Sequence, residues 1–153
     1  AFAIRSVFEN LALVRLRKDR AIVVRHKRLV AHFSPIVERL KIRFAALTAP
    51  FSSLSGGNQQ KVIIGRWLAA APGILLLDDP TKGIDIRAKQ DFYALLDELR
   101  REGLSVLLYS SEDAELLDAA DRILVFNNGR IVGELSGSTK TEYELYAAAL
   151  KSA

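Results

Sequence analysis

Two short apolar runs, each followed by polar residues, most strongly constrain how this chain folds. Ile74 to Leu77 and Leu104 to Tyr109 each have the length of a strand, and a helical pattern from Asp85 to Arg101 lies between them. Continuous apolar runs are typical of strands buried on both faces of a parallel sheet, and parallel strands need a crossover such as a helix. The sequence therefore predicts an α/β fold with a parallel sheet, flanking helices and strands buried on both faces.

Periodicity and turn residues predict the other elements. Residues 1–53 are mostly helical in pattern, with helices expected over Ser6–Leu16 and Leu29–Arg43. The remaining expected elements are a loop over Thr48–Gly57, helices over Asn58–Ala71, Glu112–Ala119 and Glu142–Lys151, and a hairpin of Arg122–Phe126 and Arg130–Glu134 with a type I′ turn at Asn127-Asn128-Gly129. We expect a helical subdomain over 1–53 and an α/β part over 54–153.

Composition narrows the classes of function. The sequence has no cysteine, which excludes disulfides and thiolate-bound metals. Its net charge of +4 is a mild excess, so we expect no nucleic-acid partner. Trp67 to Leu77 is an uncharged run too short to span a bilayer, so no direct membrane insertion is expected. His26 and His32 are interpreted as solvated helix residues.

The first candidate site is the segment Leu54-Ser55-Gly56-Gly57-Asn58-Gln59-Gln60-Lys61. Two glycines before a helix start leave backbone N–H groups open to an anion, the helix dipole favours negative charge, and Ser55 adds a hydroxyl donor. Taken alone, the segment favours a flexible loop with an N-cap serine, because Ser-Gly-Gly is a common loop composition.

Polar residues at the ends of the two expected strands form further candidate sites. Asp78 and Asp79 follow the first strand, where one carboxylate can hold Mg²⁺ through water and the other can orient an attacking water. A strand that stops at a polar turn is the simpler interpretation. Likewise, Thr81 to Asp85 is consistent with a plain turn before a helix. Ser110-Ser111-Glu112-Asp113 is consistent with Ser111 capping the helix that follows.

The order of these segments resembles the nucleotide-binding cassettes of ABC-type ATPases. LSGGNQQK resembles the family's signature motif, LLLDDP its Walker B strand and TKGIDI its D-loop, while YSSE stands where the family has its switch residue. The resemblance is tight over residues 54–135 and weaker upstream, at SVFENLAL and IVERLKI. LSGGNQQKV, GID and SSE together most resemble the second cassette of the tandem ATPases of ribose- and galactose-type sugar importers.

The resemblance implies how such a chain works. In the family, two cassettes face each other, and the signature motif of one covers the ATP held by the phosphate loop of the other. Ser55, Gly56, Gly57 and Asn58 would contact the γ-phosphate of ATP on a partner cassette, with Gln59 near that interface. Asp78 would hold Mg²⁺ through water and Asp85 would lie on the D-loop between the cassettes. The implied partners are a second cassette and transmembrane permease subunits, at the cytoplasmic face of the cell membrane.

Three departures from the family pattern bear on activity. No GxxxxGK[ST] phosphate loop occurs in the sequence, so we expect a C-terminal portion of a cassette that hydrolyses no ATP alone and that exposes apolar edges where the central strands are missing. Asp79 stands at the position of the catalytic glutamate and is one methylene shorter. Ser111 replaces the histidine that contacts the γ-phosphate, and a hydroxyl carries no positive charge.

Three other interpretations stay open. The chain is also compatible with a non-transporter ABC ATPase of DNA repair or chromosome maintenance, in which the basic run from Arg15 to Arg28 contacts DNA. A solvated helix face is the commoner origin of such a run. A non-catalytic interaction module and an α/β domain with accidental motif matches are the remaining two.

Overall fold

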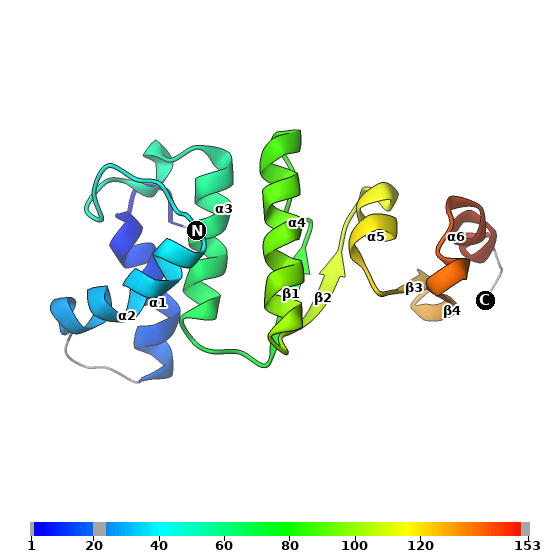
Figure 1. Ribbon diagram of the computed structural model, residues 1–153, viewed down its shortest axis with the longest axis horizontal. Helices are drawn as coiled ribbons and strands as arrows, with labels where there is room; N and C mark the ends of the chain where they lie inside the picture. The colour runs from blue at the N-terminus through cyan, green and yellow to red at the C-terminus, as the bar shows by residue number, and fades with distance from the viewer. Residues whose placement is uncertain (1, 20–23, 151–153) are drawn as a thin grey trace. The chain divides into compact units, whose positions relative to one another are not determined.

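The computed structural model describes residues 2–19 and 24–150. They fall into two compact units, each described separately: unit 1 comprises Ala1–Leu75 and Thr81–Val106, and unit 2 comprises Leu76–Pro80 and Leu107–Ala153. Each of these units is made of two separate segments, whereas the predicted division cuts the chain once, after residue 53. The predicted division stays a prediction. The elements in chain order are α1 (Val7–Lys18), α2 (His26–Arg39), the 3-10 turn η1 (Phe51–Ser53), α3 (Gly56–Leu68), β1 (Ile74–Asp78), α4 (Ile86–Arg101), β2 (Ser105–Tyr109), α5 (Asp113–Ala119), β3 (Arg122–Asn127), β4 (Arg130–Ser136), the 3-10 turn η2 (Gly137–Thr139) and α6 (Glu142–Ala149) (Figure 1).

Helix α1 begins at Val7 because Ser6 and Glu9 close its first turn. The Ser6 hydroxyl accepts from the Glu9 backbone N–H at 3.1 Å, and the Ser6 N–H donates to Glu9 Oε2 at 2.8 Å. This reciprocal pair satisfies two N–H groups that a helix start otherwise leaves without partners. The hydrogen bond from the Ser6 backbone, followed by the one from its hydroxyl, lowers the pKa of Glu9.

Helices α1, α2 and α3 of unit 1 pack closely at Gly65 of α3. A Cβ placed there would lie 3.1 Å from Leu40 Cδ1 and 3.3 Å from both Ile36 Cγ2 and Leu11 Cδ2. Leu11 comes from α1, Ile36 from α2 and Leu40 from the C-cap of α2. Only a residue without a side chain lets α1 and α2 approach α3 this closely, because protein interiors leave few voids to absorb an added methyl group.

Strands β1 and β2 are neighbours in one two-stranded sheet, joined by α4. Ser105 N lies 3.2 Å from Gly73 O and Asp79 N lies 3.0 Å from Tyr109 O, so the two strands ascend in the same direction. The predicted α/β fold with a parallel sheet and flanking helices is confirmed.

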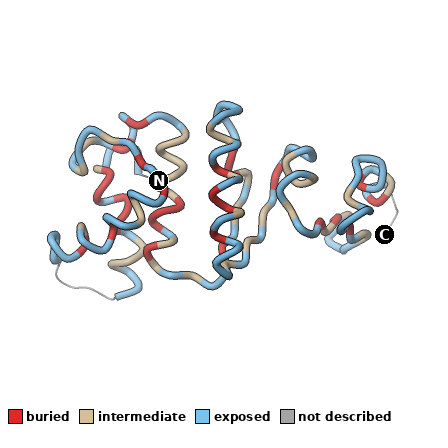
Figure 2. The backbone as a smooth tube through the Cα atoms, in the orientation of Figure 1, coloured by how far each residue is buried: buried red, intermediate tan, exposed pale blue. Residues whose placement is uncertain are grey.

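The prediction that both strand faces are buried is wrong. Alternate residues of the two strands are exposed, by 65% at Ile74, 70% at Leu76 and 61% at both Leu107 and Tyr109. No described residue covers this face of the sheet, while the residues between these positions are buried at Leu75 and half-buried at Leu77, Val106 and Leu108. Figure 2 shows the contrast with α4, whose buried positions Phe92, Leu95, Leu96 and Leu99 recur at helical spacing.

Unit 2 is built on the antiparallel hairpin of β3 and β4. Asn127 pairs with Arg130 across the turn, and Asn128 and Gly129 both have positive φ, at 49° and 75°. This confirms the predicted turn, because a type I′ turn requires positive φ at both central residues. One hairpin face packs on α6 and forms the core of the unit, which comprises Ile123, Val125, Leu135, Leu145 and Ala148.

The contact at Gly65 gives a stability prediction. We expect Gly65→Val to lower the free energy of unfolding of unit 1 by about 1–3 kcal/mol, because three side chains must move aside. Trp67, the sole tryptophan, lies two residues along α3, so urea unfolding followed by its fluorescence reports this unit. The matched control is Gly73→Val, since nothing lies within 4 Å of a Cβ there. Equal unfolding midpoints for both variants would contradict the packing argument.

Candidate functional site

The glycine-rich segment opens helix α3 rather than preceding it. The expected helix began at Asn58, but α3 begins at Gly56, with Ser55 as its N-cap. The first hydrogen bond within the helix runs from Gln59 N to Ser55 O at 2.9 Å, so the N–H groups of Gly56, Gly57 and Asn58 come before it without a helical partner. The Ser55 side chain makes no capping bond to them. Ser55 is thus the N-cap, as the loop interpretation expected, but the two glycines belong to the helix and the Ser55 hydroxyl makes no capping bond.

The side chains of Asn58 and Gln59 hold the segment in place. Asn58 Nδ2 donates to Ser55 Oγ at 2.9 Å, while Asn58 Oδ1 accepts from Arg43 N at 2.8 Å. Gln59 Nε2 donates to Leu54 O at 2.9 Å. Both amides are thus engaged within the protein, and Asn58 bonds directly to the exposed Ser55 hydroxyl.

Gly57 and Asp85 bring the starts of two helices together. A Cβ on Gly57 would lie 3.1 Å from Ala88 Cβ and one on Gly56 would lie 3.8 Å from Ile84 Cγ2, so the start of α3 touches the start of α4. Asp85 is the N-cap of α4 and accepts from Ala88 N at 2.9 Å. The predicted D-loop thus lies directly against the glycine-rich segment within unit 1.

The two aspartates after β1 have different surroundings. Asp78, the last residue of β1, is exposed, and its side chain has no hydrogen bond or ion pair among the described residues. Asp79 has a positive φ of 42°, a conformation that aspartate tolerates better than most residues. Its backbone N–H donates to Tyr109 O at 3.0 Å and its Oδ1 accepts from Ser111 N at 2.6 Å. The structure therefore brings Asp79 and Ser111 together in unit 2, with Asp79 joining the ends of the two strands.

Ser110, not Ser111, supports the start of α5. Glu112 is the N-cap of α5, and Ser110 Oγ accepts from Glu112 N at 3.1 Å and donates to Glu115 Oε2 at 2.7 Å. The capping role predicted for Ser111 is wrong, because its backbone is drawn to Asp79 and its hydroxyl bonds to no described residue. Two serines before a helix with acidic residues in its first turn predict a capping serine, but the pattern does not show which of the two makes the bond.

Sequence reasoning did not single out Arg66 of α3. Arg66 is only 8% exposed, and its Nε has no hydrogen-bond partner among the described residues. Burial lowers the pKa of this guanidinium, and its Cζ lies 6.0 Å from the Trp67 ring centroid. Arg66 lies four residues after Val62 and three before Ala69, which are both buried. This helical spacing is the sequence signal that places Arg66 on the inward face of α3.

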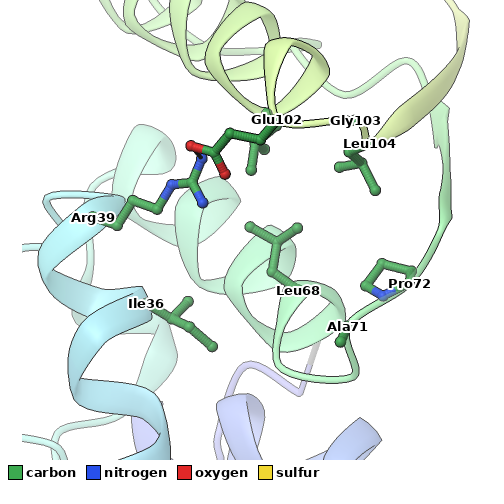
Figure 3. Close-up of a pocket in the computed structure, with 9 residues that line it drawn as sticks. Ile36, Arg39, Leu68, Ala71, Pro72, Glu102, Gly103 and Leu104 are labelled. Carbon is green, nitrogen blue, oxygen red and sulfur yellow. Dashed lines mark hydrogen bonds and ion pairs between the residues drawn. The ribbon is translucent and has the colours of Figure 1, made fainter.

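A hollow of about 340 Å³ lies elsewhere on unit 1. It is lined mainly by apolar residues at the ends of α3 and α4, including Leu68, Pro72 and Leu104. Figure 3 shows Arg39 and Glu102 facing each other beside it, and Arg39 Nη2 lies 2.7 Å from Glu102 Oε1. The hollow contains none of the residues of the candidate site.

Other features common to functional sites are missing from the part of the chain that the structure describes. Residues 2–19 and 24–150 contain no group of three or more His, Cys, Asp or Glu side chains placed to hold a metal. Over the same residues, no helix combines the length and the apolar character needed to traverse a membrane. His26 and His32 are exposed as expected, although His26 stacks on Phe8 with ring centroids 4.1 Å apart.

The Asp79 contact yields a prediction for unit 2. We expect Asp79→Ala and Asp79→Gly to speed hydrogen exchange of the Ser111 amide by about tenfold or more, since a bond to a charged acceptor contributes about 1.5–3 kcal/mol. Asp79→Asn keeps an oxygen acceptor and should change exchange much less. NMR exchange rates at Ser111 test this.

Comparing Asp79→Ala with Asp79→Gly also separates the effect of losing the hydrogen bond from the effect of the left-handed backbone conformation. Alanine at positive φ costs roughly 1–2 kcal/mol, whereas glycine adopts it freely. The free energy of unfolding of unit 2 should therefore be lower in the alanine variant than in the glycine variant. Unchanged exchange at Ser111 in both would show that Asp79 does not hold this amide.

Comparison with known sequences identifies close relatives. The chain is 45% identical over 150 residues to the ribose import ATP-binding protein RbsA of Corynebacterium glutamicum, which covers 95% of this chain and 28% of that relative. It is 40% identical over 144 residues to the xylose import ATP-binding protein XylG of Geobacillus kaustophilus, covering 94% and 29%. The chain thus spans less than a third of the length of these relatives, and the resemblance to sugar-importer ATPases is confirmed.

Solved structures agree with this relationship. The ADP conformation of an ATP-binding cassette of an ABC transporter superposes with a TM-score of 0.75 at 25% identity, covering 97% of this chain and 60% of that one. A nucleotide-free ATP-binding cassette from an ABC transporter gives a TM-score of 0.79 at 24% identity, covering 95% and 60%, which shows the fold. The sequence profile described as ABC transporter matches residues 3–82, more than half of the 153 residues. The chain therefore belongs to the ABC transporter family.

Proposed function

We propose that this segment belongs to the ATP-hydrolysing subunit of a sugar importer and completes the ATP site of a second cassette. The observation that carries the proposal is the start of α3, where an exposed hydroxyl and N–H groups without helical partners are held rigidly. Such a helix start binds phosphate, because its N–H groups donate and its dipole favours negative charge. The names of the relatives, ribose and xylose import ATP-binding proteins, support a sugar as the cargo.

Each site residue has a role in this proposal. The Ser55 hydroxyl and the N–H groups of Gly56 and Gly57 donate to the γ-phosphate of ATP bound to the partner cassette. Asn58 and Gln59 keep these donors in position through their bonds to Arg43 N and Leu54 O. Asp85 caps α4 beside the same segment and lies at the interface between the cassettes.

The carboxylates after β1 serve the chain's own nucleotide site. Asp78 is exposed and its side chain bonds to none of the residues that the structure describes, which fits a carboxylate that holds Mg²⁺ through water. Mg²⁺ bound there would neutralise charge on the nucleotide phosphates. Asp79 already accepts the Ser111 N–H, and it is shorter than the family's glutamate, so we infer that it positions water poorly. We infer that the Ser111 hydroxyl faces the γ-phosphate as a neutral donor.

The sequence contains no GxxxxGK[ST] motif, so we propose that the 153-residue chain hydrolyses no ATP by itself. The phosphate loop would come from other parts of the full protein, and the working ATP would lie on the second cassette. Permease subunits at the cytoplasmic face of the membrane would be the transport partners.

A substitution in the full-length protein that contains this segment tests the proposal. Ser55→Arg should lower steady-state ATPase turnover by roughly 100-fold, because it removes a donor and fills the space for the phosphate. The control is Ser52→Arg, an exposed serine in η1 three positions earlier, which should keep normal turnover. Undiminished turnover in the Ser55 variant would overturn the proposed role of the segment.

A further inference from the structure

A second hollow on unit 1, the basic hollow, lies between the end of α1 and the first half of α2. Its volume is about 480 Å³, and it is separate from the glycine-rich segment and from the hollow beside Arg39. It is lined by Arg15, Leu16, Asp19, Arg25, Arg28, Leu29 and His32. The basic run noted in the sequence therefore does not form a plain convex helix face, because several of its side chains converge on one concavity.

The start of α2 carries the wrong charge for a helix stabilised by its own residues. Arg25 is the N-cap and its side chain makes no capping bond, and no acidic residue occurs in the first turn. Lys27 and Arg28 follow within that turn. Cations at the positive end of a helix are destabilising, whereas an anion there is stabilising. This arrangement therefore favours an external anion at the start of α2.

Two of the arginines in the basic hollow have no acidic partner. Arg25 and Arg28 are exposed, and their side chains make no hydrogen bond or ion pair with any described residue. The one carboxylate lining the hollow, Asp19, is paired with Arg15, whose Nε lies 2.8 Å from Asp19 Oδ2. Among the described residues that line the hollow, three arginines face one aspartate, which leaves an excess of two positive charges.

The inner wall of the basic hollow is tied to the end of α3. His32 Nε2 lies 3.0 Å from Ala69 O, and since a carbonyl oxygen only accepts, this nitrogen carries the proton. Arg15 Nη1 donates to the same oxygen at 3.5 Å. These contacts hold Arg15 and His32 in place, so a ligand would meet one wall that is already ordered.

We propose that the basic hollow binds the phosphate group of a larger molecule. Guanidinium groups match phosphate geometry with paired N–H donors, and the donors of Arg25 and Arg28 bond to none of the described residues. Leu29, which is buried, and Leu16, which is half-buried, add an apolar lining that suits a phosphate attached to an organic body. Two sources supply this chemistry: a free polyphosphate compound and the headgroup of an anionic phospholipid.

Binding of inorganic pyrophosphate and of vesicles to the 153-residue chain tests the proposal. The site variant is Arg25→Gln with Arg28→Gln. The matched control is Arg17→Gln with Lys41→Gln, which removes the same number of charges from exposed residues of unit 1 that neither line the hollow nor belong to the first turn of α2. Unchanged Trp67 fluorescence confirms that each variant is folded.

When pyrophosphate binding is followed by NMR, we expect chemical-shift changes at Arg28 and His32 of the unsubstituted chain. The dissociation constant should be at least about tenfold higher in the site variant, and it should change by less than about threefold in the control. Vesicles of phosphatidylcholine with phosphatidylglycerol distinguish the source, with pure phosphatidylcholine as the blank. Tighter binding to the anionic vesicles, lost in the site variant alone, assigns a lipid headgroup. Binding of pyrophosphate alone assigns a free phosphate compound.

Three results would overturn the inference. The first is no binding of either probe. The second is an equal loss of binding in the site variant and the control, which would show a diffuse basic surface. The third is pyrophosphate shifts confined to Gly56 and Gly57, which would place the anion at the start of α3 and leave the proposed function intact.

Discussion

The close packing of α3 is the constraint on which the rest of unit 1 depends. Near its start, Gly57 lets the helix approach Ala88 of α4, and two turns later Gly65 lets Leu11, Ile36 and Leu40 converge on it. A side chain at either glycine would crowd side chains of the neighbouring helices, which would have to shift. Because α3 is held on several sides, its first turn presents the Ser55 hydroxyl and the N–H groups of two glycines in a fixed direction. The proposed function follows from this rigidity, since an anion site works best when its donors are ordered before the ligand arrives.

In unit 2, the hydrogen bond between Asp79 and the Ser111 N–H is the corresponding fixed contact. A carboxylate in a left-handed backbone position links the ends of β1 and β2 at 2.6 Å. In the proposed function, this use of the side chain would compete with orienting a water molecule for hydrolysis. The side chain of the neighbouring Asp78 bonds to no described residue, which fits the cation-holding role proposed for it. Adjacent aspartates can therefore have different roles because their backbone conformations differ.

The sequence predicted the elements well because their signals are local. The helix from Asp85 to Arg101 has strong periodicity and a capping aspartate, and Asn128-Gly129 gives a turn whose dihedral angles few other pairs adopt. Burial of Ile74 and Leu76 was predicted wrongly because the apolar run alone does not show whether another layer covers the sheet.

The finer features of the site depended on contacts between distant residues. Which serine supports α5 was decided by Asp79, which lies 32 positions before Ser111. The bond from Arg43 N to Asn58 and the hollow between α1 and α2 are likewise tertiary features without a local signal. The sequence therefore predicted where the candidate site residues lie along the chain, but it did not predict which distant residues they contact.

Calorimetric titration of Mg-ATP into the 153-residue chain, with hydrolysis followed on the same sample, most directly tests the central claim. If the segment acts only by completing the ATP site of a second cassette, the titration will show no saturable heat at micromolar ATP and no phosphate release. Saturable binding with turnover would contradict the account, because the chain would then hold and hydrolyse its own nucleotide without a phosphate loop.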